Sequence, residues 1–306
     1  MTIAHWDEAP ARRQTAGHLR ATWRDLGTAA GSVGVGVKRI EIEPGFWSTP
    51  AHVHGSAEEI FFVLDGSGLS WQDGKTYAVR PGDCLVHRRE SEPHTLQAGP
   101  DGLDVLAYGH RRFDEAAHLP RAGVSWLAES WVEAGQGAHP WEREVAAGPP
   151  EAPEPSDRPA SIVHLEDVEE EAFFEGDCGV RSRRLSAAAG SQLSGLNVDV
   201  VEPGLLNGSP HCHSAEEEIF IVLDGDGVCL LGDEEHQVRR GSVVARPPGT
   251  RVAHTFRGGD AVMTILVYGT REPNDISYYP RSGKVALRGV GVIGRLQPID
   301  EADDIW

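Results

Sequence analysis

The sequence repeats itself over roughly a hundred residues, and this repeat constrains the fold more than any other feature. Matched positions are first separated by 159 residues, as in His52 and His211, His54 and His213, Glu59 and Glu218, and Gly66 and Gly225. After one inserted residue the separation becomes 160, as in His94 and His254 or Tyr108 and Tyr268. The period is too long for a solenoid unit, so each copy should be a domain that arose by duplication.

Each copy has the pattern of short strands separated by turns. Residues 32–45, SVGVGVKRIEIEPG, alternate between apolar and polar side chains and end in a Pro-Gly turn. Residues 58–71, EEIFFVLDGSGLSW, read as a strand, a glycine-rich turn and a second strand. Helical periodicity is weak, and we expect at most short helices near residues 113–117 and 126–132. This pattern predicts an all-β fold of the sandwich or barrel type.

The repeat and the segment between its copies predict the domain organisation. Residues 145–160, VAAGPPEAPEPSDRPA, are rich in proline, alanine and acids, and they cannot form an apolar face. We expect an N-terminal arm at residues 1–30, a first domain at 31–135, a linker at 136–165, a second domain at 166–296 and a tail at 297–306.

Composition limits the classes of partner. The formal net charge of −19 opposes binding to nucleic acid and to anionic membranes, and it would admit a small anion only through local positive charge. No run of residues reaches the length of a membrane helix, and the amino terminus lacks the apolar region of a secretory signal. The four cysteines are widely spaced and form no zinc or disulfide pattern. These features predict a cytoplasmic protein.

Two histidines and a glutamate in each copy have the spacing of a metal site. On a strand, residues two apart face the same side, so His52 and His54 point together, as do His211 and His213. An ionised glutamate on the buried face of the next strand is costly unless it is paired or coordinated. A divalent cation would satisfy all three groups, and a fourth ligand would come from His94 or His254. The predicted ligands are His52, His54, Glu59 and His94 in one copy, and His211, His213, Glu218 and His254 in the other.

The ligand types restrict the metal. Three imidazoles and one carboxylate suit Mn²⁺, Fe²⁺, Co²⁺, Ni²⁺, Cu²⁺ or Zn²⁺, whereas Ca²⁺ and Mg²⁺ prefer oxygen ligands. Four protein ligands around a six-coordinate ion leave two positions open, and four ligands around tetrahedral zinc leave none. We expect up to one metal in each domain. The neighbouring acids Glu58, Glu216 and Glu217 are expected to be exposed or to lie behind the ligands, not to act in catalysis.

The pattern HxH(x)4E(x)6G resembles the first motif of the cupin superfamily, and it occurs twice, from His52 to Gly66 and from His211 to Gly225. The second cupin motif is recognisable in Gly241, Pro247-Pro248-Gly249 and His254, whereas the first copy lacks its proline and glycine. The resemblance covers about two thirds of the chain. It implies a bicupin, with two tandem small jelly-roll β-barrels, short peripheral helices and a metal inside each barrel. Cupins often associate, so the resemblance also allows a homodimer.

The resemblance implies several functions. The leading hypothesis is a metal-dependent, dioxygenase-like oxidoreductase acting on a small organic molecule, because the inward positions beside the ligands are apolar. The alternatives are a decarboxylase or isomerase, which needs an acid or base near the metal, and a metal-dependent small-molecule binding protein without catalysis. No catalytic residue can be named from the sequence. The predicted pocket residues are Phe61, Val63, Leu96, Phe220, Val222 and Phe256.

Overall fold

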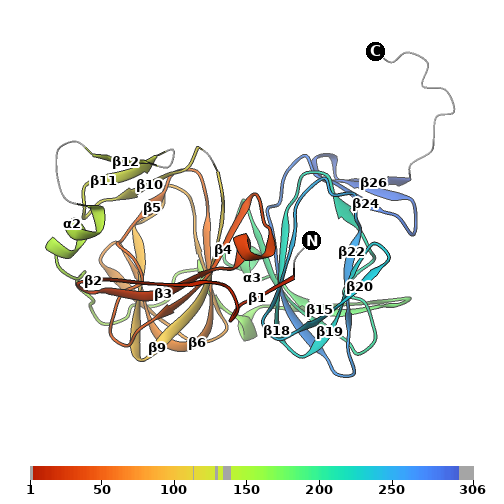
Figure 1. Ribbon diagram of the computed structural model, residues 1–306, viewed down its shortest axis with the longest axis horizontal. Helices are drawn as coiled ribbons and strands as arrows, with labels where there is room; N and C mark the ends of the chain where they lie inside the picture. The colour runs from red at the N-terminus through yellow and green to blue at the C-terminus, as the bar shows by residue number, and fades with distance from the viewer. Residues whose placement is uncertain (1–2, 113, 128–129, 134–138, 296–306) are drawn as a thin grey trace, which may run out of the picture.

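The protein forms two β-barrels that lie side by side, as the prediction of tandem barrels requires (Figure 1). The computed structural model describes residues 3–112, 114–127, 130–133 and 139–295. Among these residues, no helix is both long enough and apolar enough to cross a membrane.

The first barrel is built from one large antiparallel sheet with the strand order β13-β8-β6-β9-β4-β3-β2, and β7 pairs with β6. Its two longest strands, β6 and β9, pair along most of their length and carry the wall of the barrel. The strands are β2 (Ala11–Ala16), β3 (Leu19–Asp25), β4 (Val35–Ile42), β6 (Glu59–Gln72), β7 (Lys75–Val79), β8 (Asp83–His87), β9 (His94–His110) and β13 (Ile162–His164). β2, β3 and β13 come from the segments on either side of the first repeat.

The second barrel has two sheets, with the strand orders β1-β21-β18-β23-β16-β15-β14 and β20-β19-β22. The amino-terminal strand β1 pairs with β21, so the chain begins against the second barrel before it enters the first. The strands are β1 (Ile3–His5), β14 (Glu170–Glu175), β15 (Cys178–Arg183), β16 (Gly195–Val201), β18 (Glu218–Asp224), β19 (Asp226–Leu231), β20 (Glu234–Arg239), β21 (Ser242–Arg246), β22 (His254–Gly258) and β23 (Met263–Gly269).

A small four-stranded sheet lies beside each barrel, on the same side of the molecule (Figure 1). The first is β12-β11-β10-β5 and the second is β17-β24-β25-β26. Their strands are β5 (Val53–His54), β10 (Ala116–Leu119), β11 (Val124–Leu127), β12 (Ser130–Glu133), β17 (Cys212–His213), β24 (Ile276–Tyr279), β25 (Lys284–Leu287) and β26 (Val292–Arg295). Each of these sheets holds one histidine of the HxH pair, because β5 and β17 are two of their strands.

The helices predicted near residues 113–117 and 126–132 are wrong for the described part of these segments. Residues 116 and 117 lie in β10, and the second segment falls in the hairpin of β11 and β12, where Trp126 pairs with Trp131. Residues 113, 128 and 129 lie outside the described residues. The aromatic and β-branched side chains here favour paired strands over helix. The short helices lie elsewhere, at α1 (Leu26–Ala30), α2 (Pro140–Ala146) and α3 (Leu185–Ala188).

The apolar run between the glutamate and the closing glycine of each motif is buried on both faces of its strand. In β6, Phe61 and Val63 belong to the core of the first barrel, whereas Ile60 and Phe62 belong to a cluster shared by the two barrels. The second barrel has its own core, which includes Phe220 and Val222 of β18. Alternate side chains of a strand point to opposite faces, so a strand between two cores reads as a continuous apolar run.

The glycine that closes each first motif is required by the backbone. Gly66 and Gly225 have positive φ values of 77° and 75°. A Cβ atom at either position would collide with backbone, at the carbonyl oxygen of Gly102 in the first barrel and of Val262 in the second. The chain can therefore turn here and cross the barrel only with glycine at this position.

The two barrels meet across a shared apolar interface with nearly two-fold character. Tyr108 and Tyr268, which are equivalent in the repeat, stack with ring centroids 5.1 Å apart. Glu58 accepts hydrogen bonds from the backbone N–H groups of Gln192 and Leu193 in the second barrel. Glu217 accepts hydrogen bonds from Val33 and Gly34 in the first barrel. The duplicated acids thus join the barrels in a reciprocal manner.

Candidate metal centres

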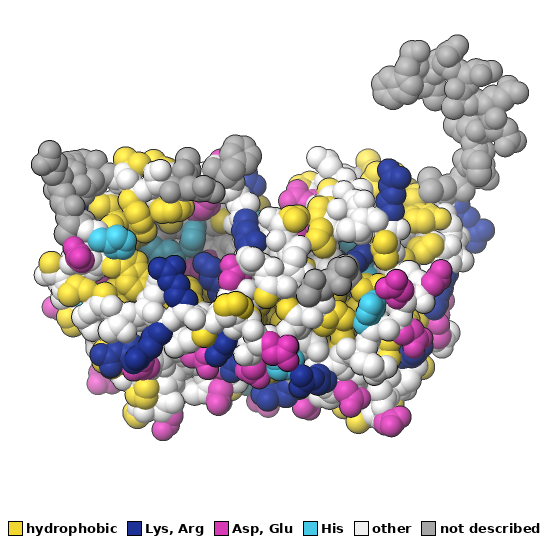
Figure 2. Space-filling model, in the orientation of Figure 1, with side chains coloured by type: hydrophobic (Ala, Val, Ile, Leu, Met, Phe, Trp, Pro, Cys, Tyr) yellow, Lys and Arg dark blue, Asp and Glu magenta, His cyan; other side chains and the backbone are white. Residues whose placement is uncertain are grey.

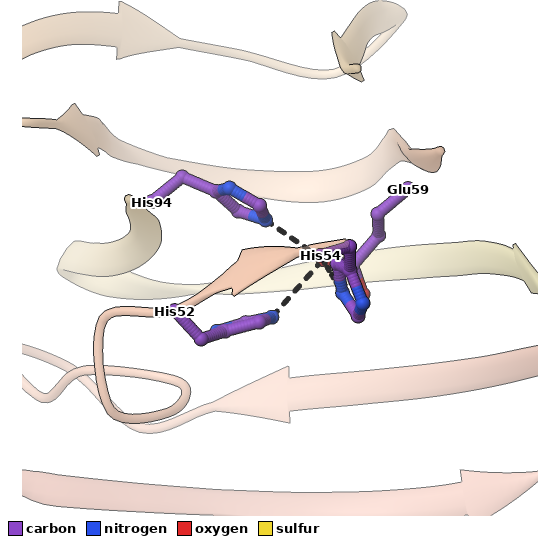
Figure 3. Close-up of side chains that lie close together, drawn as sticks. All are labelled: His52, His54, Glu59 and His94. Carbon is purple, nitrogen blue, oxygen red and sulfur yellow. Dashed lines mark hydrogen bonds and ion pairs between the residues drawn. The ribbon is translucent and has the colours of Figure 1, made fainter. Parts of the chain in front are cut away.

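The four predicted ligands of the first repeat come together from separate strands (Figure 3). His54 lies in β5, Glu59 begins β6 and His94 begins β9. His52 and His94 exchange backbone hydrogen bonds, from His52 N to His94 O at 3.1 Å and in return at 2.9 Å. This rung of the ladder holds their two imidazoles side by side, with ring centroids 4.7 Å apart.

The second repeat builds the same arrangement. His213 lies in β17, Glu218 begins β18 and His254 begins β22. His211 and His254 also exchange backbone hydrogen bonds, and their ring centroids are again 4.7 Å apart. The ligand atoms of each set lie within 4.8 Å of one another.

The imidazole Nε2 atoms of each set converge on one carboxylate oxygen. In the first set, Glu59 Oε2 lies 2.9 Å from His94 Nε2, 3.4 Å from His52 Nε2 and 3.6 Å from His54 Nε2. In the second set, Glu218 Oε2 lies 2.8 Å from His254 Nε2, 3.1 Å from His213 Nε2 and 3.9 Å from His211 Nε2. Six nitrogen donors and two carboxylates therefore form two compact groups of the type that binds a metal ion.

The other ring nitrogen fixes the orientation of most of these imidazoles. His52 Nδ1 lies 3.0 Å from the carbonyl oxygen of Pro50, and His211 Nδ1 lies 2.9 Å from that of Ser209. A carbonyl oxygen only accepts hydrogen bonds, so each Nδ1 carries the proton and each Nε2 presents a lone pair. This is the tautomer that a metal ligand requires.

Two acids behind the ligands were not found by sequence reasoning. Glu115 Oε1 lies 3.0 Å from His54 Nδ1, and Asp275 Oδ2 lies 2.7 Å from His213 Nδ1. Both acids also accept hydrogen bonds from the backbone after the HxH pair, at Ser56 and at Ala215. A signal was present in the sequence, because residues 115 and 275 are separated by the same 160 positions as the later matched residues of the repeat.

Burial and opposite charge pull the pKa values of the ligands in different directions. Burial alone would lower the pKa of His54, but contacts with Glu115 and Glu59 raise it to about 10. Burial alone would also lower the pKa of His213, but Glu218 and Asp275 raise it to about 9. Burial alone would raise the pKa of Glu218, but His213 and His254 hold it well below its usual range. Without a metal, each cluster therefore contains an ionised glutamate beside a protonated histidine.

The residues present fit a divalent transition metal. The Nε2 atoms of His54, His213 and His254 are buried and have no hydrogen-bond partner among the described residues, although each is close to a glutamate. Buried polar atoms without partners are costly, and a cation at the centre of the group would satisfy them together. The donor set of three imidazoles and one carboxylate suits transition metals and disfavours calcium and magnesium.

The two centres differ in the residue that lies opposite the glutamate on the neighbouring strand. In the first barrel it is His87, whose ring stacks on His94 with centroids 3.7 Å apart and an interplanar angle of 6°. Burial and the neighbouring His94 hold the pKa of His87 well below its usual range. In the second barrel it is Arg246, which donates to Thr250 and to the carbonyl oxygen of Val252. The duplicated centres therefore have different surroundings.

The acids between the HxH pair and the ligand glutamate were expected to be exposed or to lie behind the ligands, and the exposed alternative is wrong for all three. Glu58, Glu216 and Glu217 are 1%, 5% and 2% exposed. Glu58 and Glu217 bind the opposite barrel, as described above. Glu216 forms an ion pair with Arg288, and its carboxylate lies within 4.8 Å of ligand atoms of His213 and Asp275. Burial and the charge of Glu218 raise the pKa of Glu216 to about 7.

A cavity of about 620 Å³ opens onto the second centre. Its wall includes the ligands His211, His213 and Glu218, and it is otherwise mostly polar, with Glu216, Asp199, Asn197, Ser182, Tyr279 and three arginines. Its size suits a small ligand. In Figure 2, histidine side chains show at the bottom of a hollow in the face of the first barrel. A larger space of about 780 Å³, lined by residues of both repeats, touches none of the eight ligands.

The six apolar residues predicted to line a pocket lie in packed cores. Phe61, Val63 and Leu96 belong to the core of the first barrel, and Phe220, Val222 and Phe256 to that of the second. Phe61 and Phe220 touch the imidazoles of His94 and His254 edge-on, with centroids 6.2 and 5.3 Å apart. None of the three residues from the second repeat lines the cavity at the second centre.

Comparisons with known proteins agree with the duplicated architecture. A family profile described as "Cupin domain" matches residues 38–105 and again 197–268. The formate complex of oxalate decarboxylase from Lactobacillus farciminis is similar in structure, with a TM-score of 0.58 and 14% sequence identity over 88% of this chain and 85% of that one. Oxalate decarboxylase from Bacillus subtilis at pH 4.6 is similar with a TM-score of 0.57 and 14% identity, over 88% of this chain and 75% of that one. The sequence has no match among curated proteins.

Proposed function

This chain is a bicupin of the cupin superfamily, and we propose that it is a metal-dependent enzyme that converts a small polar molecule in its second barrel by non-oxidative chemistry. The reaction class is that of a decarboxylase or isomerase. The observation that carries this proposal is the buried carboxylate of Glu216, which stands in the cavity wall beside the ligand His213.

The second centre has the parts that such a reaction needs. A divalent metal held by His211, His213, Glu218 and His254 would act as a Lewis acid that polarises an oxygen of the substrate. Glu216 is in position to accept or return a proton at its carboxylate, and Arg288 orients it through their ion pair. Asp275 holds His213 in place through a hydrogen bond to its Nδ1. We assign Asp275 no role in proton transfer, because its carboxylate also accepts hydrogen bonds from two backbone N–H groups.

The polar wall favours this reaction class over the dioxygenase hypothesis. That hypothesis rests on apolar residues around the metal, and the apolar residues of the second repeat are packed in the core. The equivalent positions of the two repeats support a specialised second centre: Glu216 replaces Ala57, and Asp199 replaces Ile40. The likeness to oxalate decarboxylases adds support at the level of the fold.

The test is turnover with and without dioxygen. Chain loaded with Mn²⁺, Fe²⁺, Co²⁺, Ni²⁺ or Zn²⁺ is incubated with a panel of small hydroxy acids, keto acids and dicarboxylates. We expect anaerobic turnover that falls by about 10²–10⁴-fold in the Glu216→Gln variant while its metal content stays unchanged. Glu235→Gln, at an exposed acid paired with Arg257, is the control and should keep full activity. Turnover only with dioxygen would support the dioxygenase hypothesis instead.

A further inference from the structure

Equivalent arginines of the two repeats have different partners. In the first repeat, Arg111 is fully engaged. Its Nη2 donates to Asp25 Oδ1 at 3.0 Å and to Thr28 Oγ1 at 2.8 Å, and its Nη1 donates to the carbonyl oxygen of Ser32 at 3.2 Å. Asp25 neutralises the guanidinium, so this cation has no charge to offer a ligand.

In the second repeat the neutralising acid is replaced by a cation. Arg271 is the counterpart of Arg111, and the position of Asp25 is taken by Arg184. Arg271 makes no hydrogen bond or ion pair with any residue that the structure describes, yet it is only partly exposed and lines the cavity at the second centre. The carboxylates of Glu216 and Glu58 act on this half-buried guanidinium through charge but form no hydrogen bond with it, so its N–H groups can bind an anion from outside the chain.

The arginine lies close to the metal ligands across the sheet. A Cβ atom at Gly195 would come within 3.1 Å of Arg271 Nε, so the guanidinium lies against this glycine. Gly195 pairs with Gly269, and Gly269 pairs on its other side with the ligand Glu218. Two strand spacings separate Gly195 from Glu218, which is about 10 Å between backbones. A small molecule can span the distance from the guanidinium to the metal.

We propose that Arg271 binds an anionic group, a carboxylate or a phosphate, of the molecule that occupies the cavity of the second barrel. The planar guanidinium matches both groups through paired hydrogen bonds. Arg288 and Arg184 line the same cavity, but they are paired with Glu216 and Glu171, so Arg271 is the arginine of this wall whose N–H groups remain for a ligand. Non-specific anion binding is disfavoured in a chain of net charge −19, so an anion bound here depends on this local cation. The inference rests on the proposed function only in placing the substrate in this cavity.

The test is anion binding measured by titration calorimetry, with malonate and inorganic phosphate as probes. The 306-residue chain should bind one anion, and Arg271→Gln should weaken the binding about tenfold or more. Arg184→Asp should weaken it similarly although Arg271 remains, because the new acid would pair with Arg271 as Asp25 pairs with Arg111. Arg111→Gln is the matched control from the first repeat and should bind the anion as the unaltered chain does. Far-UV circular dichroism checks that each variant is folded.

The two probes distinguish the source of the anionic group, since preference for malonate indicates a carboxylate and preference for phosphate indicates a phosphorylated molecule. The proposal is overturned if neither probe binds below about 10 mM, or if folded Arg271→Gln and Arg184→Asp bind as tightly as the unaltered chain. Loss of binding in these variants, together with no turnover by the metal-loaded chain, would contradict the proposed reaction and leave the anion site standing. Turnover of uncharged molecules by a chain that binds neither probe would support the proposed reaction and contradict the anion site.

Discussion

Glu58 and Glu217 occupy the same position in the two repeats, and each binds the backbone of the opposite barrel. Glu58 accepts from Gln192 N at 2.8 Å and from Leu193 N at 2.9 Å. Glu217 accepts from Val33 N at 3.0 Å and also from Gly34 N. Both carboxylates are almost fully buried, and the acids that follow the HxH pair in sequence differ in role: one belongs to the candidate metal centre, and its neighbour joins the two barrels.

We expect Glu217→Ala to destabilise the protein by about 1–3 kcal/mol, because it leaves the N–H groups of Val33 and Gly34 without partners in the interface. Urea unfolding followed by fluorescence measures the change. Glu171→Ala, at an exposed acid paired with Arg184, should change stability by less than about 0.5 kcal/mol. Equal stability of Glu217→Ala and Glu171→Ala would show that this contact does not hold the barrels together.

The acids behind the histidines should control metal affinity in each barrel separately. Asp275→Asn removes the charge that orients His213, and we expect affinity at the second centre to fall about 10- to 100-fold. Glu115→Gln should have the same effect at the first centre through His54. Competition with a chromophoric chelator measures both sites. A loss that is spread evenly over both centres in either variant would contradict this assignment.

Metal binding should release protons and strengthen as pH rises. His54 and His213, with pKa values of about 10 and about 9, are protonated at neutral pH in the metal-free chain. Each must lose its proton to bind a metal, so affinity should rise about tenfold per pH unit up to about pH 9. Calorimetry in buffers of different ionisation enthalpy would count the released protons. Affinity that does not change between pH 7 and 9 would show that these histidines are not protonated in the metal-free chain.

Stability of the metal-free chain should have the opposite pH dependence. A raised histidine pKa stabilises the fold fully below its ordinary value of 6.5, and this contribution is lost as pH rises through about 9 at His213. A lowered glutamate pKa, as at Glu218, stabilises the fold above its ordinary value of 4.5 and is lost in acid. Burial lowers the pKa values of His94 and His254 to about 4, and their contribution is present above pH 6.5 and lost as pH falls. We therefore expect the urea midpoint to be highest near pH 6.5 and to decline both in acid and toward pH 9. Bound metal should reduce that decline.

Much of the fold could be predicted from the sequence because duplication makes its signals appear twice. The common register of His52 and His211, and of Glu59 and Glu218, divides eight residues of the sequence into two sets of four, and the fold brings each set together. Period-two alternation identified the strand within residues 32–45. The continuous apolar run of β6 arises because its two sides are buried against different cores. Strand spacing predicts which residues of one strand share a face, but it does not predict which residues of other strands lie against that face.

The surroundings of the sites depend on contacts that no local pattern reveals. The roles of Glu58 and Glu217 come from the packing of one barrel on the other, and neither role is visible within a single repeat. The polar cavity wall comes from β15, β16 and the small sheet, which the spacing of the HxH pair does not identify. The predicted helix at residues 126–132 competed with a hairpin whose cross-strand pair of Trp126 and Trp131 stabilises it.

The central claim is that each barrel holds one metal ion through its own glutamate, and metal content per chain tests it most directly. The unaltered chain, purified without an affinity tag and saturated with Mn²⁺ or Zn²⁺, should contain two ions by elemental analysis after gel filtration. Glu59→Ala and Glu218→Ala should each contain one, and the double variant none. Unaltered chain that retains no metal, or a Glu218→Ala variant that still holds two ions, would contradict the account.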